Sequence, residues 1–322
     1  MNIYDEKENF NRIISWNSPF FVPTTLPSRG IVYPGASAGH NRPSPRAGEW
    51  KDIWGVTWID ADGEVFPSGP AISSVEDINR YQPPDPHAPS IAEGLEEQAS
   101  RIDRNRFFLS VAHRSLLYHK GFNIMGPEGF LMALATGDAA PLLDKIIGFE
   151  LGIAEEYVRF RPDHLNTSDD FGMQDRLVVS PQMWRRLFKP RLKMLYDFYR
   201  DRLGDGLVIS HHSCGHVMPI LEDFIELGVN ILHPVQTAAN DLGELRRRTS
   251  RRLVLAGGID GQQVLPLGSP AQVREEVFRK LDMLWEGGGY LPMPEKMLGV
   301  PACNKEAMHE AIREWSRLNV ES

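Results

Sequence analysis

Short apolar runs alternate with helical patterns along the last two-thirds of this 322-residue chain. The expected strands cover residues 107–112, 163–166, 207–210, 228–232, 252–256 and 289–291. The expected helices cover residues 180–202, 217–227, 241–249, 270–286 and 305–318. Ser180 and Ser269 each precede a proline, as is typical of a helix N-cap followed by position N1. Repeated strand-then-helix units predict a parallel sheet of the α/β class, and at this length they favour a (β/α)8 TIM barrel.

The first 105 residues have a different pattern, rich in proline, glycine and aromatic side chains. Apolar runs at 56–59 and 64–66 predict a small hairpin. Ser74 followed by two acids predicts a helix start, and residues 92–104 have an amphipathic helical pattern. We therefore expect residues 1–105 to form an extension that wraps or caps the barrel. Residues 106–322 then form the main part of the barrel, within one structural domain overall.

Polar side chains follow nearly every expected strand. In a (β/α)8 barrel the active site is built just beyond the C-terminal ends of the strands, so these side chains are expected to converge from different strands. They are Asp169, Asp170, His212, Cys214, His233, Gln236, Asp260 and Glu295.

The segment 210–216 places three imidazoles and one thiol within seven residues, directly after a buried strand. Residues two apart in extended backbone face the same way, so His212 and Cys214 can bind one metal ion. The alternative is a hydrogen-bonded strand end with an inert thiol. His211 faces either the site or the barrel wall.

Charge and cysteine content narrow the class of protein. A formal net charge of −8 does not suit a nucleic-acid backbone or an anionic membrane surface. Only two cysteines occur, which argues against a secreted disulfide framework. The start of the sequence does not have the pattern of a signal peptide, and no apolar run approaches the roughly 20 residues that span a bilayer. A cytoplasmic location is expected. The absence of glycine-rich phosphate-binding fingerprints argues against a nucleotide-binding sheet.

Several motifs recur in an order that is typical of one family. They cover residues 4–10, 52–56, 169–174, 179–181, 212–217, 230–236, 257–262 and 287–290. On these motifs the chain resembles the uroporphyrinogen decarboxylase superfamily, and most closely its corrinoid-dependent methyltransferase branch. The resemblance implies a TIM barrel with its active site at the C-terminal mouth. It also implies transfer of a methyl group between a small methylated substrate and the cobalt of a corrinoid (cobalamin), carried on a separate corrinoid protein.

Relatives with a His-x-Cys-Gly motif hold zinc with that pair and a later cysteine. Here the later position falls on or beside Lys296, so either Glu295 or Cys303 completes the site, or no zinc is bound. A carboxylate is an acceptable zinc ligand, and Glu295 is the expected third ligand beside His212 and Cys214. Loss of one thiolate favours demethylation of an ether or amine, with O-demethylation of a methoxylated aromatic preferred, over activation of a thiol.

The remaining predicted roles follow from the charge that develops on a leaving oxygen. Catalytic roles are expected for Asp170, His211 and His233. Substrate binding is expected for Asp169, Gln174, Gln236, Asp260, Phe122 and Met125, the last two as an apolar wall. Each has a structural alternative: the carboxylates as helix caps, and Phe122 and Met125 as core.

Two other functions stay open. One is a metal-free decarboxylase, although the matching N-terminal region supplies only Arg29 to grip substrate carboxylates. The other is a non-catalytic corrinoid- or tetrapyrrole-binding protein. The sequence leaves open the methyl donor, the direction of transfer and the oligomeric state, a homodimer included.

Overall fold

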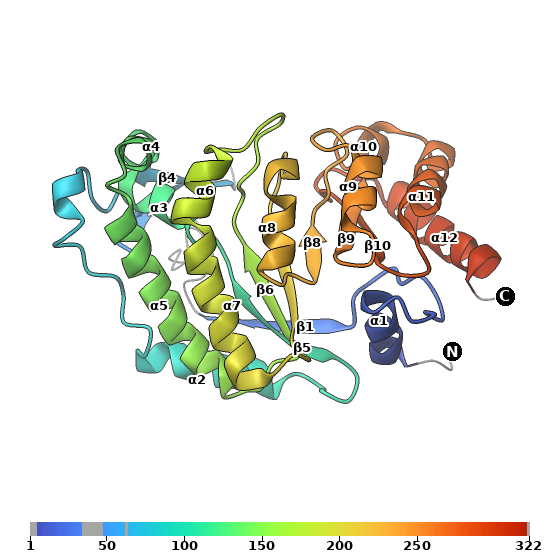
Figure 1. Cartoon of the computed structure of the whole chain (residues 1–322), viewed down its shortest axis with the longest axis horizontal. Coiled ribbons are helices and arrows are strands. Elements are labelled where there is room, and N and C mark those ends of the chain that lie inside the picture. The colour runs from blue at the N-terminus through green and yellow to red at the C-terminus, as the bar shows by residue number, and fades with distance from the viewer. Residues whose placement is uncertain (1–4, 34–47, 62–63, 321–322) are drawn as a thin grey trace.

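A seven-stranded parallel sheet forms the centre of the molecule (Figure 1). The computed structural model describes residues 5–33, 48–61 and 64–320. In spatial order the strands are β1 (Ser28–Val32), β5 (Phe108–His113), β6 (His164–Ser168), β7 (Val208–His212), β8 (Ile231–His233), β9 (Val254–Ile259) and β10 (Tyr290–Pro294). The sheet curls into part of a barrel and is flanked by helices, which confirms the predicted α/β barrel class. Every expected strand of the last two-thirds of the chain is present.

The first strand was not expected from the sequence. β1 comes from the N-terminal segment and pairs in parallel with β5, with Ser28 opposite Phe108. Its exposed start, Ser28-Arg29-Gly30, carries little apolar signal. The segment 1–105 therefore contributes one strand to the main sheet, in addition to the helices and strands that it places around the barrel.

Helices follow most strands and cover the outer face of the sheet. After β1 and β5 come α2 (Pro89–Ser100), α3 (Tyr118–Met125), α4 (Pro127–Thr136) and α5 (Ala140–Val158). The next are α6 (Pro181–Leu187), α7 (Lys189–Leu203), η2 (Met218–Ile220), α8 (Leu221–Glu226) and α9 (Leu242–Thr249). The last are α10 (Val264–Leu267), α11 (Pro270–Leu284) and α12 (Ala302–Asn319). In Figure 1, α5, α7, α8 and α9 stand in a row in front of the strands.

The predicted helix starts at Ser180 and Ser269 are confirmed. Ser180 accepts from the backbone of Met183, and Ser269 forms a reciprocal capping box with Gln272. The helix expected over 180–202 is divided at Phe188, because Pro190 has no N–H to continue the ladder of hydrogen bonds. The helix expected after Ser74 is only the three-residue turn η1 (Val75–Asp77).

Helix α1 (Glu6–Ile14) plugs the barrel interior near the N-terminal ends of the strands. Its side chains Phe10 and Ile13 are buried in an apolar cluster with inward-facing residues at the starts and middles of the strands. The strand residues of this cluster are Phe108, Val208, Ile231, Val254, Ala256 and Leu291. The free space of the barrel interior therefore lies on the C-terminal side of this plug.

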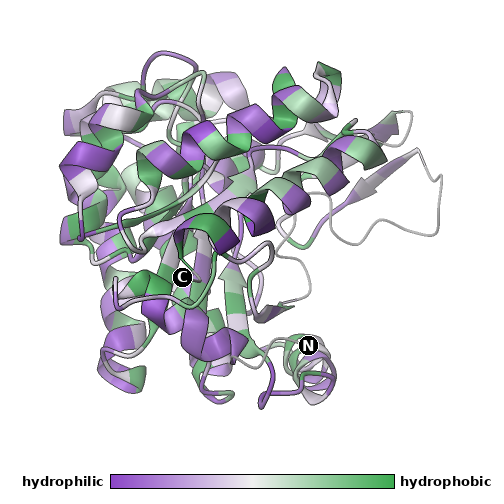
Figure 2. Ribbon diagram, turned by 90° about the vertical axis from the view of Figure 1, so that its right-hand side faces the viewer, coloured by the Kyte–Doolittle hydropathy of each residue, from purple (hydrophilic) through white to green (hydrophobic). Residues whose placement is uncertain are grey.

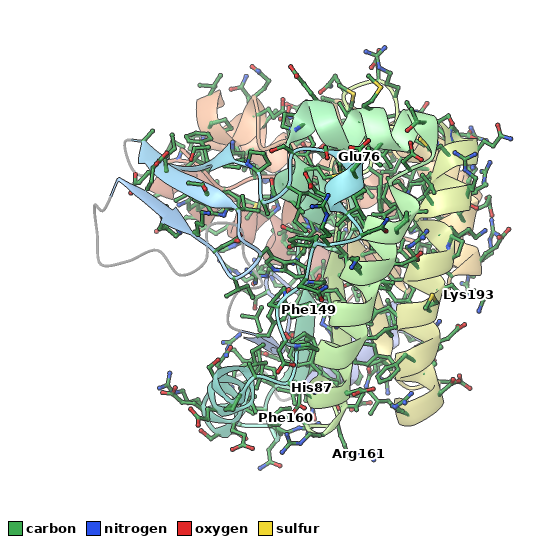
Figure 3. The ribbon with its side chains drawn as sticks, turned by 90° about the vertical axis from the view of Figure 1, so that its left-hand side faces the viewer. Glu76, His87, Phe149, Phe160, Arg161 and Lys193 are labelled. Atoms are coloured by element: carbon green, nitrogen blue, oxygen red, sulfur yellow. The ribbon has the colours of Figure 1, made fainter. Side chains whose placement is uncertain are left out.

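The predicted hairpin is present as part of a second, antiparallel sheet. It consists of β2 (Glu49–Lys51), β3 (Thr57–Ala61) and β4 (Glu64–Gly69), and it extends from one side of the barrel (Figure 2). The N-terminal segment is anchored to the barrel beside it. The ring of Phe149 on α5, which is labelled in Figure 3, has its centroid 4.6 Å from that of the Trp54 ring. None of the described helices is long and apolar enough to cross a membrane.

Candidate metal and substrate site

Asp170, His212 and Cys214 converge at the C-terminal end of the sheet. One ligand atom from each lies within 4.8 Å of the other two. His212 Nε2 is 3.3 Å from Cys214 Sγ and 3.5 Å from a carboxylate oxygen of Asp170. All three side chains are half-buried. A nitrogen, a sulfur and an oxygen donor at this spacing suit Zn²⁺, so the residues present fit such an ion.

The register of the sheet creates this meeting. Ser168 lies opposite His212 in the β6–β7 pair, so the turn after β6 runs beside the turn after β7. Asp170 Oδ1 accepts a hydrogen bond of 2.8 Å from the backbone N–H of Cys214. This bond fixes the carboxylate next to the thiol. Asp170, expected as a catalytic group, thus lies close enough to His212 and Cys214 to bind the same metal ion.

His233 joins the cluster from the next strand. Its Nδ1 lies 2.9 Å from Nδ1 of His212, so one imidazole donates a hydrogen bond to the other. Burial and the neighbouring His212 lower the pKa of His233 to about 4. Burial also lowers the pKa of His212, against the opposing charge of Asp170. Both rings are therefore neutral near pH 7, and a neutral imidazole is the form that binds metal.

The thiol of Cys214 is protonated in this environment without a cation. Burial, then Asp170 and Glu295, raise its pKa to about 12. A thiolate needs a nearby positive charge, and a bound metal ion deprotonates a coordinating thiol. The site thus has the negative surroundings that a divalent cation would neutralise.

His119 belongs to this site although the sequence analysis did not single it out. Its Nδ1 lies 3.1 Å from Asp169, and its Nε2 lies 3.7 Å from Asp170. Burial acts to lower the pKa of His119, but the hydrogen bond and charge of Asp169 and the charge of Asp170 raise it overall. No motif spacing links His119 to the later residues, because α3 reaches the site through tertiary packing.

Asp169 is a helix-capping residue, as its structural alternative predicted. It is fully buried and accepts backbone N–H bonds from Leu117, Tyr118 and His119 at the start of α3. Burial would raise the pKa of Asp169, but the hydrogen bond and charge of His119 and these amides lower it. Asp169 therefore positions α3 and His119, and it does not open onto the site.

His211 is directed away from the cluster. It is fully buried on the outer face of β7, where Nδ1 lies 2.9 Å from the hydroxyl of Thr167 and 3.0 Å from that of Tyr196. Its ring stacks on Phe171, and burial lowers its pKa to about 3. Neighbouring residues of a strand face opposite sides, so His211 and His212 cannot both face the barrel interior.

Three predicted substrate-binding residues shape the surrounding loops. Gln236 Oε1 accepts from the backbone N–H of Gly215 at 2.6 Å. Gln174 donates to the carbonyl of Ala238 at 3.0 Å. Asp260 accepts from two backbone N–H groups in the turn that follows β9. These contacts hold the mouth of the barrel in place.

Glu295 lies at the end of β10, outside the three-residue cluster. It accepts a hydrogen bond of 2.5 Å from the backbone N–H of Thr237, and burial raises its pKa despite that bond. Asp170 therefore lies within the group of three donors that could hold one ion, whereas Glu295 lies outside that group. Cys303 is exposed on α12, with its Sγ 3.7 Å from the side chain of Asn304.

Phe122 and Met125 pack within the helical layer around α3. Met125 is buried in the main core, and the half-buried Phe122 lies against that core. The centroid of the Phe122 ring is 6.0 Å from that of Tyr118. The structure places both side chains in the packing around α3, as their structural alternative predicted.

A chamber of about 190 Å³ lies inside the barrel below His212 and His233. It lies on the C-terminal side of the apolar plug made by α1, and strands β6 to β10 supply its wall. The residues that line it are Leu26, His164, Asn166, Ser210, His212, Ile231, His233, Ala256 and Met293. His164, Asn166 and Ser210 were not predicted as site residues, since polar residues within a strand carry no motif.

Comparison with known proteins agrees with this architecture. The profile of uroporphyrinogen decarboxylase (URO-D) matches residues 140–315, more than half of the chain. A solved methyltransferase from Methanosarcina mazei is similar to the structure with a TM-score of 0.63, at 17% sequence identity. The similarity covers 82% of this chain and 76% of that one. No curated protein matches the sequence. At this identity the structural likeness shows a shared fold.

Proposed function

Since this chain belongs to the uroporphyrinogen decarboxylase (URO-D) family, we propose that it is a methyltransferase with a metal site at Asp170, His212 and Cys214. The observation that carries the proposal is the convergence of these three donors beside an interior chamber. Catalytic zinc sites keep three protein ligands and leave a fourth position for substrate. The methyltransferase of the same fold from Methanosarcina mazei supports the same reaction class.

The reaction we propose is O-demethylation of a small methoxylated aromatic, with the methyl group passed to the cobalt of a corrinoid on a partner protein. Bound zinc would supply a Lewis acid that withdraws charge from the leaving oxygen. His212 and Cys214 on β7 and Asp170 after β6 would hold that ion. The chamber would hold the substrate, and the barrel mouth is the side from which the corrinoid would approach.

The other residues of the site have roles that follow from their contacts. His233 is hydrogen-bonded to Nδ1 of His212, and this bond leaves Nε2 of His212 as the nitrogen that is free to bind metal. His119 has a raised pKa and lies 3.7 Å from Asp170, so it is suited to hold a proton at the edge of the site. Such a proton could be given to the leaving oxygen.

A decarboxylase acting on a substrate with many carboxylates is less well supported. Arg29 lies on β1, with its guanidinium over the ring of Phe107 and hydrogen-bonded to the carbonyl of Ser28. Within the described ranges, no lysine or arginine is among the residues that line the chamber. A polycarboxylate would need several fixed cations.

An anaerobic absorbance assay tests the proposal. The purified protein is mixed with cob(I)alamin and a panel of methoxyaromatics and methylamines, and its zinc content is measured on the same sample. Formation of methylcob(III)alamin with one donor establishes the activity. Absence of methyl transfer with every donor, together with absence of zinc, would reject it. The variants C214S and C303S form a matched pair, of which only C214S should lose zinc and activity.

A further inference from the structure

Asn166 offers an unused hydrogen-bonding group to the barrel interior. It lies in the middle of β6, between His164 and Ser168, and it lines the chamber. Its side chain is exposed, although the flanking residues Leu165 and Thr167 are fully buried. No hydrogen bond joins its amide to any other described residue. A polar side chain inside a barrel that has no protein partner is available to a ligand.

The rest of the chamber is neutral. Among the residues that the structure describes, no lysine, arginine, aspartate or glutamate lines it. His164 is hydrogen-bonded to the hydroxyl of Ser210 at 2.8 Å, and burial lowers its pKa to about 4, so it is uncharged near pH 7. The opposite wall is apolar, made by Leu26, Ile231, Ala256 and Met293. Away from the proposed metal position, an anion in this space would lose its hydration without gaining a cationic partner among the described side chains.

The volume of the chamber limits the size of its ligand. An apolar cavity of about 150 Å³ is enough to bind benzene. A chamber of about 190 Å³ therefore accommodates one aromatic ring with a small substituent. A tetrapyrrole is far too large for it. The apolar wall suits the face of the ring, and the amide of Asn166 suits an oxygen on its rim.

We propose that this chamber selects an uncharged, single-ring methoxyarene. The amide of Asn166 binds an oxygen substituent of that ring. Analogues that carry a carboxylate or sulfonate are rejected. The inference rests on the proposed function, and it adds the charge of the substrate and a residue that determines specificity.

Equilibrium binding without corrinoid tests the proposal by calorimetry. The probes are 2-methoxyphenol, 4-hydroxy-3-methoxybenzenesulfonate and the neutral methyl sulfone of the same shape as the sulfonate. We expect both neutral probes to bind on the order of 100-fold more tightly than the sulfonate, because only the sulfonate brings an unpaired charge into the chamber. Equal affinity for the sulfonate and the methyl sulfone would overturn the proposal, since charge would then have no effect.

Variants of Asn166 test its part in the selection. N166A should weaken the binding of 2-methoxyphenol about 10-fold, and N166Q should restore part of the loss. N105A, at an exposed turn, is the control and should bind as the parent does. Thermal unfolding checks that each variant is folded. Wild-type affinity in a folded N166A would remove Asn166 from the site. Intact, charge-selective binding without methyl transfer would instead reject the proposed reaction and leave the chamber assignment standing.

Discussion

Asp170 accepts the backbone N–H of Cys214 at 2.8 Å, although 44 residues separate the two along the chain. This bond joins the turn after β6 to the turn after β7. Because the same carboxylate also lies 3.5 Å from His212 Nε2, one hydrogen bond arranges three donors of different chemistry before any ligand arrives. Such prior arrangement reduces the ordering that metal binding requires.

The variant D170N should bind zinc more weakly. It preserves the shape of the side chain and an oxygen that can accept from Cys214, but it removes the negative charge. We expect zinc affinity to fall at least about 10-fold, measured by competition with a chromophoric chelator. Asp175 lies on the same loop and is exposed, so D175N is the matched control. Unchanged affinity in D170N would exclude Asp170 as a ligand.

Cys214 should be almost unreactive in metal-free protein near neutral pH. With a pKa of about 12, only about one thiol in 10,000 is ionised at pH 8, and the thiolate is the reactive form. In the C303S background, alkylation by iodoacetamide should therefore continue to accelerate up to pH 11, as followed by mass spectrometry. A rate that levels off by pH 9 would contradict the raised pKa.

Local patterns in the sequence account for much of this fold. The strand-and-helix rhythm after residue 106 depends on short-range periodicity, and the pair His212 and Cys214 depends on the two-residue repeat of one strand. Helices α3 and α4 were missed because Gly126 and Pro127 interrupt the apolar pattern between them. Helix α5 was also not predicted. β1 was missed because its first half is polar and exposed.

The other parts of the site depend on tertiary structure. Asp170 reaches Cys214 only through the β6–β7 register, and His119 reaches Asp170 only because Asp169 caps α3. The choice between His211 and His212 depends on which face of β7 meets the helices. Both faces of a parallel barrel strand are buried, so alternation alone does not decide this.

His164 should make the protein sensitive to acid. Its pKa is about 4 in the folded state, because burial disfavours the charged ring, and about 6.5 when unfolded. Between these pH values the unfolded chain therefore binds more protons than the folded protein. The contribution of His164 to the stability of the fold is complete above pH 6.5 and is lost as the pH falls towards 4. The loss from pH 7 to pH 4.5 should be about 2 kcal/mol in the free energy of unfolding.

Denaturant unfolding of the parent and of H164Q at both pH values measures this contribution. The variant removes the titrating group, so its stability should depend less on pH by about the same 2 kcal/mol. Ser210→Ala keeps His164 and removes only its hydroxyl partner, so it should retain the acid sensitivity. Parallel pH dependence in the parent and H164Q would show that His164 does not contribute.

The backbone at Gly172 is in close contact with the backbone at Gly215 beside the metal cluster, and neither position should tolerate a side chain. A Cβ on Gly215 would overlap the backbone carbonyl of Gly172, and a Cβ on Gly172 would overlap the segment 214–216. The variant G215A should therefore push Cys214 away from Asp170 and lower both stability and zinc affinity. We expect a loss of about 2 kcal/mol or more in the free energy of unfolding, together with reduced zinc content.

Gly204 serves as a control that separates two causes of such a loss in stability, namely backbone strain and overlap of the added Cβ with the neighbouring turn. It has nearly the same backbone angle, φ of 82° against 81° at Gly215, but a Cβ there would meet open space. G204A thus reports only backbone strain, because a φ of 82° with a ψ of −179° is a conformation almost restricted to glycine and costs other residues on the order of 1–3 kcal/mol. Zinc titration and denaturant unfolding of both variants measure the difference. If G215A lost no more stability than G204A and kept its zinc, the two turns would have room to separate without disturbing the metal ligands.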